Sequence, residues 1–127
     1  MAAGAPVENV FMPNVPALSQ QDLEQLTTVF RLLADRTRLN ILMLLLEGER
    51  NVTSLCEELK LPQPTVSHHL GLLRMHNLIT NRRSGKQVFY SLGSPGDDIN
   101  SQMLQVTLDR FCVSVRSLLS EPEAAAV

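Results

Sequence analysis

The three histidines are the residues with the clearest chemical potential, and all of them lie in "PQPTVSHHLGLLRMHNLI", positions 62–79. They could be metal ligands, catalytic bases or contacts to a polyanion. The apolar spacing predicts a helix over about 64–76, in which the adjacent residues His68 and His69 point about 100° apart. Two helical ligands of one ion normally lie three or four positions apart. His69 and His76 are seven apart, which disfavours a metal site built from this helix.

Catalysis is disfavoured by the same stretch. Ser67 beside His68 has the residue types of a nucleophile and a base, but a third group must orient such a base. No orienting group, glycine elbow or phosphate-cradling loop accompanies the pair. The sequence therefore predicts neither an enzyme nor a cofactor.

The outer side of the expected 64–76 helix fits the third alternative, a contact to a nucleic acid. Val66, Leu70 and Leu73 cluster on one side and predict the buried face. The opposite side is small and polar, as a helix entering a major groove about 12 Å wide requires. We expect the DNA contacts of this helix to come from Gln63, Pro64, Thr65, Ser67 and His68. His69, on the border of the apolar face, is expected to be structural and to bond the backbone.

The distribution of charge supports this interpretation, although the formal net charge is only −2. Residues 59–96 contain no carboxylate side chain but hold five of the eleven basic residues. Such a segregated field attracts phosphates whatever the total charge. Near the end of this span, "LITNRR-SGK-QVFYSL" predicts a two-stranded hairpin. Its basic residues, expected to contact phosphates or the minor groove, are Arg82, Arg83 and Lys86.

The elements that position these residues follow from caps and periodicity. Residues 1–18 are expected to form a flexible arm, 19–119 one domain and 120–127 a frayed tail. Within the domain, Ser19 predicts a helix start that runs to about 34, and Asp35 caps a central helix over about 36–47 that stops at Gly48. Thr53 is expected to cap a helix over about 54–60, and Asn77 to end the next one in a left-handed conformation. A last helix is predicted over about 98–119.

Composition limits the setting. The chain has 127 residues, 44% of them hydrophobic, which suits one domain with a modest core. Its longest apolar run, "ILMLLL", is far too short to span a bilayer, and no signal peptide is recognised. Two cysteines suggest reduced thiols rather than a disulfide framework. We therefore expect a cytoplasmic protein without a membrane partner.

At this point the chain resembles a known family. Residues 33–92, with "LADRTRLNIL", "PTVSHHLGLL" followed by "NLI", and "VFYSL", are similar to the ArsR/SmtB-type bacterial repressors. The resemblance implies a mainly α, winged helix-turn-helix fold with a small β-hairpin wing. It also implies a homodimer formed by the first and last helices, which represses transcription by binding a palindromic operator in double-stranded DNA. Gln63, Pro64, Ser67 and His68 then occupy the positions that this family uses at the groove.

Family members often respond to a metal, metalloid or thiol reagent, so inducer ligands are a further question. The zinc-type site on the last helix needs histidines, and residues 98–119 contain none. The arsenic-type site needs more than one thiol, and the matching segment has Cys56 alone. A metalloid or redox switch that uses Cys56 and Cys112 stays an alternative to two inert thiols. A winged-helix module that binds another protein is the alternative of a different class.

Overall fold

The computed structural model describes residues 17–93 and 103–118. Along the chain, the helices are α2 (Gln20–Leu33), α3 (Arg36–Glu47), α4 (Val52–Leu59) and α5 (Gln63–Met75). The strands are β1 (Arg50–Asn51), β2 (Ile79–Ser84), β3 (Gln87–Leu92), β4 (Met103–Thr107) and β5 (Cys112–Arg116). The expected arm and tail lie outside the described residues, except for positions 17 and 18.

Local caps explain where the first helices begin. Ser19 accepts a hydrogen bond from the Asp22 backbone N–H at 3.0 Å, and Asp22 accepts one from the Ser19 N–H at 3.0 Å, which forms a capping box. Asp35 accepts from the Arg38 N–H at 3.0 Å. Both predicted starts are confirmed, as is the end of α3 at Gly48.

The start of α4 was predicted wrongly. Asn51, not Thr53, is the N-cap, and its side chain accepts from the Ser54 N–H at 2.8 Å. Asn51 also pairs with Phe89 as part of β1, so the sheet holds it in the extended conformation that an N-cap needs. The helix therefore starts two residues earlier than the cap rule applied to Thr53 suggests.

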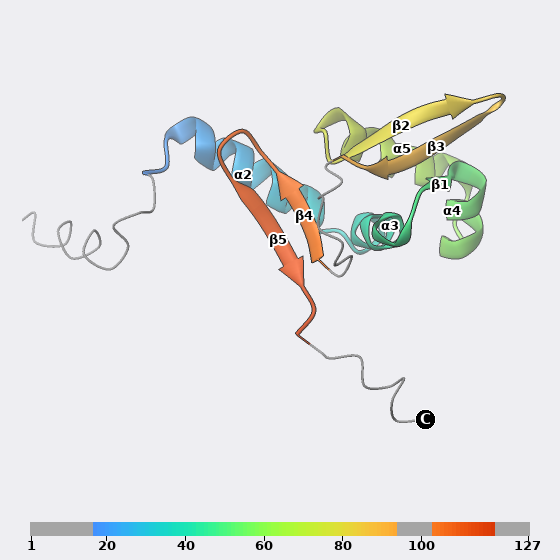
Figure 1. The fold of residues 1–127 in the computed structure, drawn as a ribbon, viewed down its shortest axis with the longest axis horizontal. Coiled ribbons are helices and arrows are strands. Elements are labelled where there is room, and N and C mark those ends of the chain that lie inside the picture. The colour runs from blue at the N-terminus through green and yellow to red at the C-terminus, as the bar shows by residue number, and fades with distance from the viewer. Residues whose placement is uncertain (1–16, 94–102, 119–127) are drawn as a thin grey trace, which may run out of the picture.

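A three-stranded antiparallel sheet of order β1-β3-β2 forms the wing, with α4 and α5 beside it (Figure 1). The hairpin predicted from "LITNRR-SGK-QVFYSL" is confirmed, with Ile79 opposite Leu92 and Ser84 opposite Gln87. Gly85 turns the chain with a φ of 65°, a conformation that favours glycine. Asn77 has a φ of 64°, which confirms its predicted left-handed conformation between α5 and β2.

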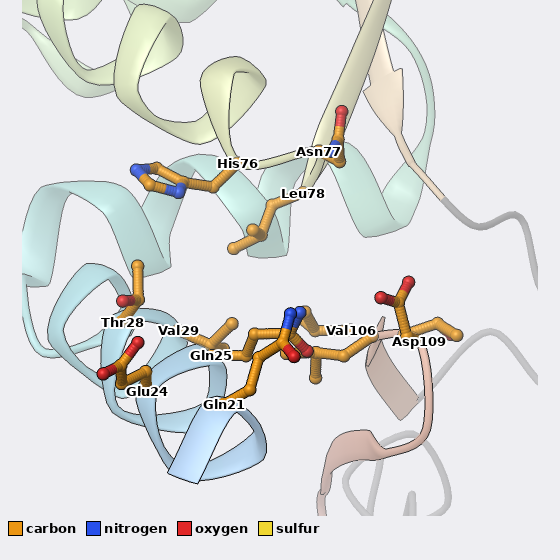
Figure 2. Close-up of a pocket in the computed structure, with 12 residues that line it drawn as sticks. Gln21, Glu24, Gln25, Thr28, Val29, His76, Asn77, Leu78, Val106 and Asp109 are labelled. Atoms are coloured by element: carbon orange, nitrogen blue, oxygen red, sulfur yellow. The ribbon is translucent and has the colours of Figure 1, made fainter.

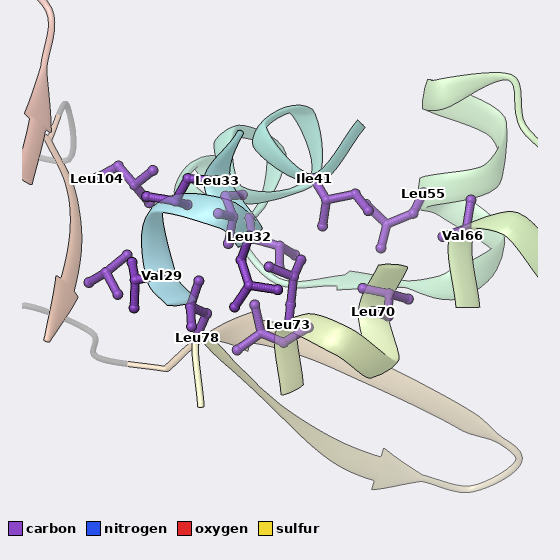
Figure 3. Close-up of a cluster of buried hydrophobic side chains, with 14 residues drawn as sticks. Val29, Leu32, Leu33, Ile41, Leu55, Val66, Leu70, Leu73, Leu78 and Leu104 are labelled. Atoms are coloured by element: carbon purple, nitrogen blue, oxygen red, sulfur yellow. The ribbon is translucent and has the colours of Figure 1, made fainter. Parts of the chain in front are cut away.

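One core joins these elements (Figure 3). Ile41, Leu42 and Leu55 are fully buried, and Val66, Leu70 and Leu73 bring the inner face of α5 into the same cluster. The central position predicted for α3 is confirmed, because it contributes Ile41, Leu42 and Leu45. Since its inner side is embedded here, α5 presents its other side outward.

The predicted helix over 98–119 is wrong for its described part. Residues 103–118 instead form the hairpin β4–β5, in which Leu104 lies opposite Val115 and Val106 opposite Val113. Leu104 and Val106 are buried, and the residues beside them are less so, which is the period of two of a strand. β-Branched residues favour this pairing. The dimer interface was expected to consist of the first and last helices. Residues 103–118 do not form such a last helix, so they could contribute only as a hairpin. Residues 98–102 and 119 lie outside the described part.

Arg110, between β4 and β5, ties this hairpin to α2. Its Nη1 lies 3.0 Å from Asp22 Oδ2. The backbone N–H of Ser19 is the main reason why the pKa of Asp22 is lowered, and Arg110 adds to the effect. Across residues 17–93 and 103–118, no helix has the length and apolarity needed to cross a membrane.

Candidate nucleic-acid interface

The first turn of α5 is set by two prolines. Pro62 is extended, with a ψ of 151°, and its carbonyl accepts from the Thr65 and Val66 N–H groups at 3.1 and 3.2 Å. Pro64 lies in the first turn, where an amide hydrogen has no partner within the helix. The chain thus breaks after α4 and restarts at once, which confirms the predicted helix-turn-helix.

The side of α5 opposite the core is exposed. We call its first two turns the α5 edge, which consists of Gln63, Pro64, Thr65, Ser67 and His68. Within the described structure, the side chains of Gln63, Thr65 and Ser67 make no hydrogen bond to other protein groups. The His68 ring also makes no hydrogen bond there, and its centre lies 5.6 Å from that of the His69 ring. Their donors and acceptors are therefore free for a partner.

Gly71 continues this edge one turn further. A Cβ at this position would meet no atom within 4 Å, so neither packing nor a positive φ requires glycine here. Glycine inside a helix costs up to about 1 kcal/mol relative to alanine. Gly71 therefore lowers the stability of α5, although the fold has room for a larger side chain at this position.

His69 is half-buried and contacts α3 rather than a free surface. Its Nδ1 lies 3.3 Å from Nη1 of Arg38, whose Nε donates to the Leu32 carbonyl at 2.7 Å. A guanidinium can only donate, so Nδ1 of His69 accepts and Nε2 carries the hydrogen. The predicted structural role fits this geometry, but the partner is a side chain and not the backbone.

The wing presents its basic residues on two different faces. Residues opposite each other in an antiparallel pair share a face, and neighbours along a strand alternate. Arg83 shares its face with Ile79, which is buried at the base of the wing, and Arg82 shares the other face with Phe89. Arg83 and Lys86 are exposed, and no ion pair involves either of them in the described structure.

Arg82 already has a partner, which the sequence did not reveal. Its Nε and Nη2 donate to Glu49 Oε2 and Oε1 at 2.8 and 2.7 Å, in a two-pronged ion pair. These hydrogen bonds from Arg82 are the main reason why the pKa of the Glu49 carboxyl is lowered, and they raise the pKa of Arg82. Although residues 59–96 hold no acid, folding brings a carboxylate to the wing from the end of α3.

A groove between α5 and β2 adds residues that were missed from the sequence. Its volume is about 610 Å³, and its lining includes Gly71, Arg74 and Asn81. Arg74 is exposed on the last turn of α5 and lies in the acid-free span, so the charge pattern could have identified it. The groove lies between the exposed side of α5 and the wing.

A second cleft, of about 430 Å³, separates α2 from the segment after α5 and from β4–β5. Figure 2 shows Glu24 and Thr28 on one side, Asp109 on the other, and His76 across from α2. Its lining contains two carboxylates and no lysine or arginine. This cleft therefore does not extend the basic surface.

The two cysteines lie on separate parts of the fold. Cys56 is half-buried on α4, and Cys112 is exposed on β5. These elements occupy opposite sides of the molecule (Figure 1). Among residues 17–93 and 103–118, no three side chains of histidine, cysteine or acid gather in a way that could hold a metal ion.

Comparison with known proteins identifies relatives of this arrangement. The family described as "Bacterial regulatory protein, arsR family" matches residues 35–81. The regulator KmtR of Mycobacterium tuberculosis is 47% identical over 64 residues, which are 50% of this chain and 49% of that protein. The chain thus spans about half the length of this relative.

Two further matches extend over most of the relative. The arsenical resistance operon repressor of Staphylococcus xylosus is 36% identical over 91 residues, which cover 70% of this chain and 88% of the repressor. A homodimeric winged helix-turn-helix DNA-binding domain from Mycobacterium bovis is 30% identical, with a TM-score of 0.56 over 63% of this chain and 77% of that domain. The wing and the helix pair described above are the elements of this fold.

Proposed function

Because the chain belongs to the arsR family of bacterial regulatory proteins, we propose that it is a sequence-specific DNA-binding repressor of transcription and not an enzyme. The observation that carries the proposal is the α5 edge. It offers polar side chains without protein partners on a helix whose other face is anchored in the core. Hydroxyl, amide and imidazole groups at such an edge can bond base edges in a major groove.

In this proposal the wing contacts the DNA backbone. Arg83 and Lys86 are exposed cations near the tip of the hairpin, and Arg74 lies in the groove between the wing and α5. Phosphate contacts fix the position of a protein on DNA, while the base contacts carry the sequence preference. The base contacts of Ser67 and His68 are supported by Gln63 and Thr65 at the start of α5.

We further propose a homodimer that binds a palindromic operator. α2 leaves Leu23 and Phe30 43% and 55% exposed, and their spacing of seven places them along one stripe. A second copy would cover this stripe, as dimerisation does in many small regulators. The relative from Mycobacterium bovis is described as homodimeric. Bacterial transcription takes place in the cytoplasm, so we place the protein there.

Thiol sensing remains the second candidate, since the relatives include repressors of arsenical resistance. Cys56 lies on α4 and Cys112 on β5, and these two elements are on opposite sides of the fold (Figure 1). An inducer that uses both would need to join two protomers. A DNA affinity that changes on addition of arsenite or an oxidant, and loses this response in Cys56→Ser and Cys112→Ser, would support the candidate.

A mobility-shift titration with a random-sequence duplex at several salt concentrations tests the proposal. The affinity should fall steeply with salt, and Arg83→Gln should reduce the salt slope by about 1 for each protomer in contact with DNA. Arg116→Gln, an exposed charge on β5, is the matched control and should leave the slope unchanged. Absence of binding at low salt would favour a protein-interaction module instead.

A further inference from the structure

The ion pair between Glu49 and Arg82 has the geometry of a phosphate contact. A guanidinium offers a planar fork of N–H groups that fits a carboxylate and a phosphate in the same way. Glu49 occupies the Nε and Nη2 side of that fork at 2.8 and 2.7 Å. A DNA phosphate that approached this side of Arg82 would meet a carboxylate already in its place.

Both partners are held in position by their surroundings. Ser91 donates to Glu49 Oε2 at 3.1 Å, which fixes the carboxylate from β3. The Arg82 guanidinium carbon lies 4.9 Å from the centre of the Phe89 ring, directly opposite on β3. Glu49 itself follows Gly48 at the end of α3. The pair therefore connects the face of the wing to the central helix.

The pair also lies at the surface, where it can exchange partners. The side chains of Arg82 and Glu49 are 57% and 32% exposed, so water and ions reach them. Exposed ion pairs are individually weak, because water and salt screen them. A phosphate held nearby could displace the carboxylate. A hairpin that enters a groove has a sugar-phosphate strand beside each of its faces, so Arg82 and Arg83 can contact different strands.

We propose that Glu49 is a specificity-determining residue that acts by occupying Arg82. This inference rests on the proposed DNA-binding function. On DNA of random sequence, the α5 edge does not dock and the ion pair stays closed, so the wing attracts phosphates less. On an operator, the docked α5 edge keeps a phosphate at high effective concentration beside Arg82, and the phosphate replaces Glu49. Glu49 thereby weakens non-specific binding more than operator binding.

The decisive variant is Glu49→Gln, which keeps the shape of the side chain but removes its charge. The probes are a random-sequence duplex and a duplex that the wild-type protein enriches from a random pool. One additional phosphate contact adds about 0.9 to the salt slope, which corresponds to about eightfold tighter binding at 0.1 M salt for each wing. We expect this gain on the random duplex and a clearly smaller gain on the enriched duplex.

Two controls separate this mechanism from simpler ones. Glu57→Gln removes one exposed acid on α4 that has no ion-pair partner in the described structure, and it should give much less than the eightfold gain. In an Arg82→Gln background, Glu49→Gln should give no more than the small gain of Glu57→Gln, because the residue through which Glu49 acts is gone. Circular dichroism establishes that each variant is folded.

The outcomes distinguish this inference from the proposed function. If the wild-type protein enriches no sequence and binds no duplex at low salt, the DNA-binding function itself fails. If the wild type binds DNA but Glu49→Gln gains equally on both duplexes, or loses affinity, only the role of Glu49 is overturned. An eightfold gain that persists in the Arg82→Gln background also overturns it.

Discussion

Gly71 allows a sharp test, because folding and DNA binding should respond to the same substitution in opposite directions. Gly71→Ala adds a methyl group in the middle of α5, where nothing lies within 4 Å of the new Cβ. Alanine is favoured over glycine inside a helix by about 1 kcal/mol. For a domain of this size, that raises the melting temperature by about 5 °C.

The same methyl group should weaken binding to DNA. Gly71 lies one turn beyond Ser67, on the continuation of the α5 edge, so the group projects toward the bases that the edge approaches. Overpacking a close contact costs about 1–3 kcal/mol, and 1.4 kcal/mol corresponds to a tenfold loss of affinity. We therefore expect about tenfold weaker binding of the enriched duplex, and a larger loss for Gly71→Leu.

Thermal unfolding and a fluorescence-anisotropy titration measure the two effects on the same samples. Asn40→Ala is the control: it improves helix propensity at an exposed position of α3, and should raise the melting temperature without changing DNA affinity. If Gly71→Ala and Gly71→Leu bind the duplex as tightly as the wild type, the outer side of α5 does not approach DNA closely.

Two further predictions concern the parts that hold α5 in place. Arg38→Gln removes the 2.7 Å hydrogen bond to the Leu32 carbonyl and the contact with His69. It should destabilise the protein by about 2–3 kcal/mol in urea unfolding. The control is Arg36→Gln, at an exposed position of the same helix, which should cost much less; equal losses would show that the Arg38 contacts are unimportant. The pKa of Asp35 is lowered, first by its hydrogen bond from the Arg38 backbone and then by the charge of Arg38. A lowered folded pKa stabilises the protein above the unfolded value, about 3.9, and this contribution is lost as the pH falls through the folded value. The stability advantage of the wild type over Asp35→Asn should therefore shrink below about pH 4, and a constant difference from pH 6 down to pH 3 would contradict this assignment.

The elements around α5 could be predicted from the sequence because the signals are local. Ser19 and Asp35 satisfy backbone N–H groups three residues away, and the prolines at 62 and 64 act on their own turn. The buried face of α5 follows from the helical period alone. The exposed positions of Ser67 and His68 follow from the same arithmetic, since they lie opposite that face.

The errors arose where distant parts of the chain decide the outcome. Residues 103–118 contain apolar residues that satisfy both a helical and an alternating pattern. The structure resolves this in favour of strands, because β4 buries Leu104 and Val106 while β5 completes the pairing. Asn51 caps α4 because its pairing with Phe89 fixes its backbone. Neither constraint lies within a helical turn of the residue concerned.

Charge analysis along the chain has the same limitation. The span 59–96 contains no acid, which led us to treat Arg82 and Arg83 alike. Glu49 is 33 residues from Arg82 in the sequence, but forms its ion pair in the fold. The alternation of β2 then separates the two arginines onto opposite faces. A run of basic residues thus indicates a charged surface without showing which of them are available.

Selection of bound duplexes from a random DNA pool tests the central claim most directly, with the wild-type protein compared with the Ser67→Ala/His68→Ala variant. The wild type should enrich one two-fold symmetric sequence, with half-sites about 10–10.5 base pairs apart or a multiple of this spacing. The variant should remain folded and bind DNA, but lose this preference. Enrichment of the same sequence by both proteins would contradict the assignment of base recognition to the α5 edge.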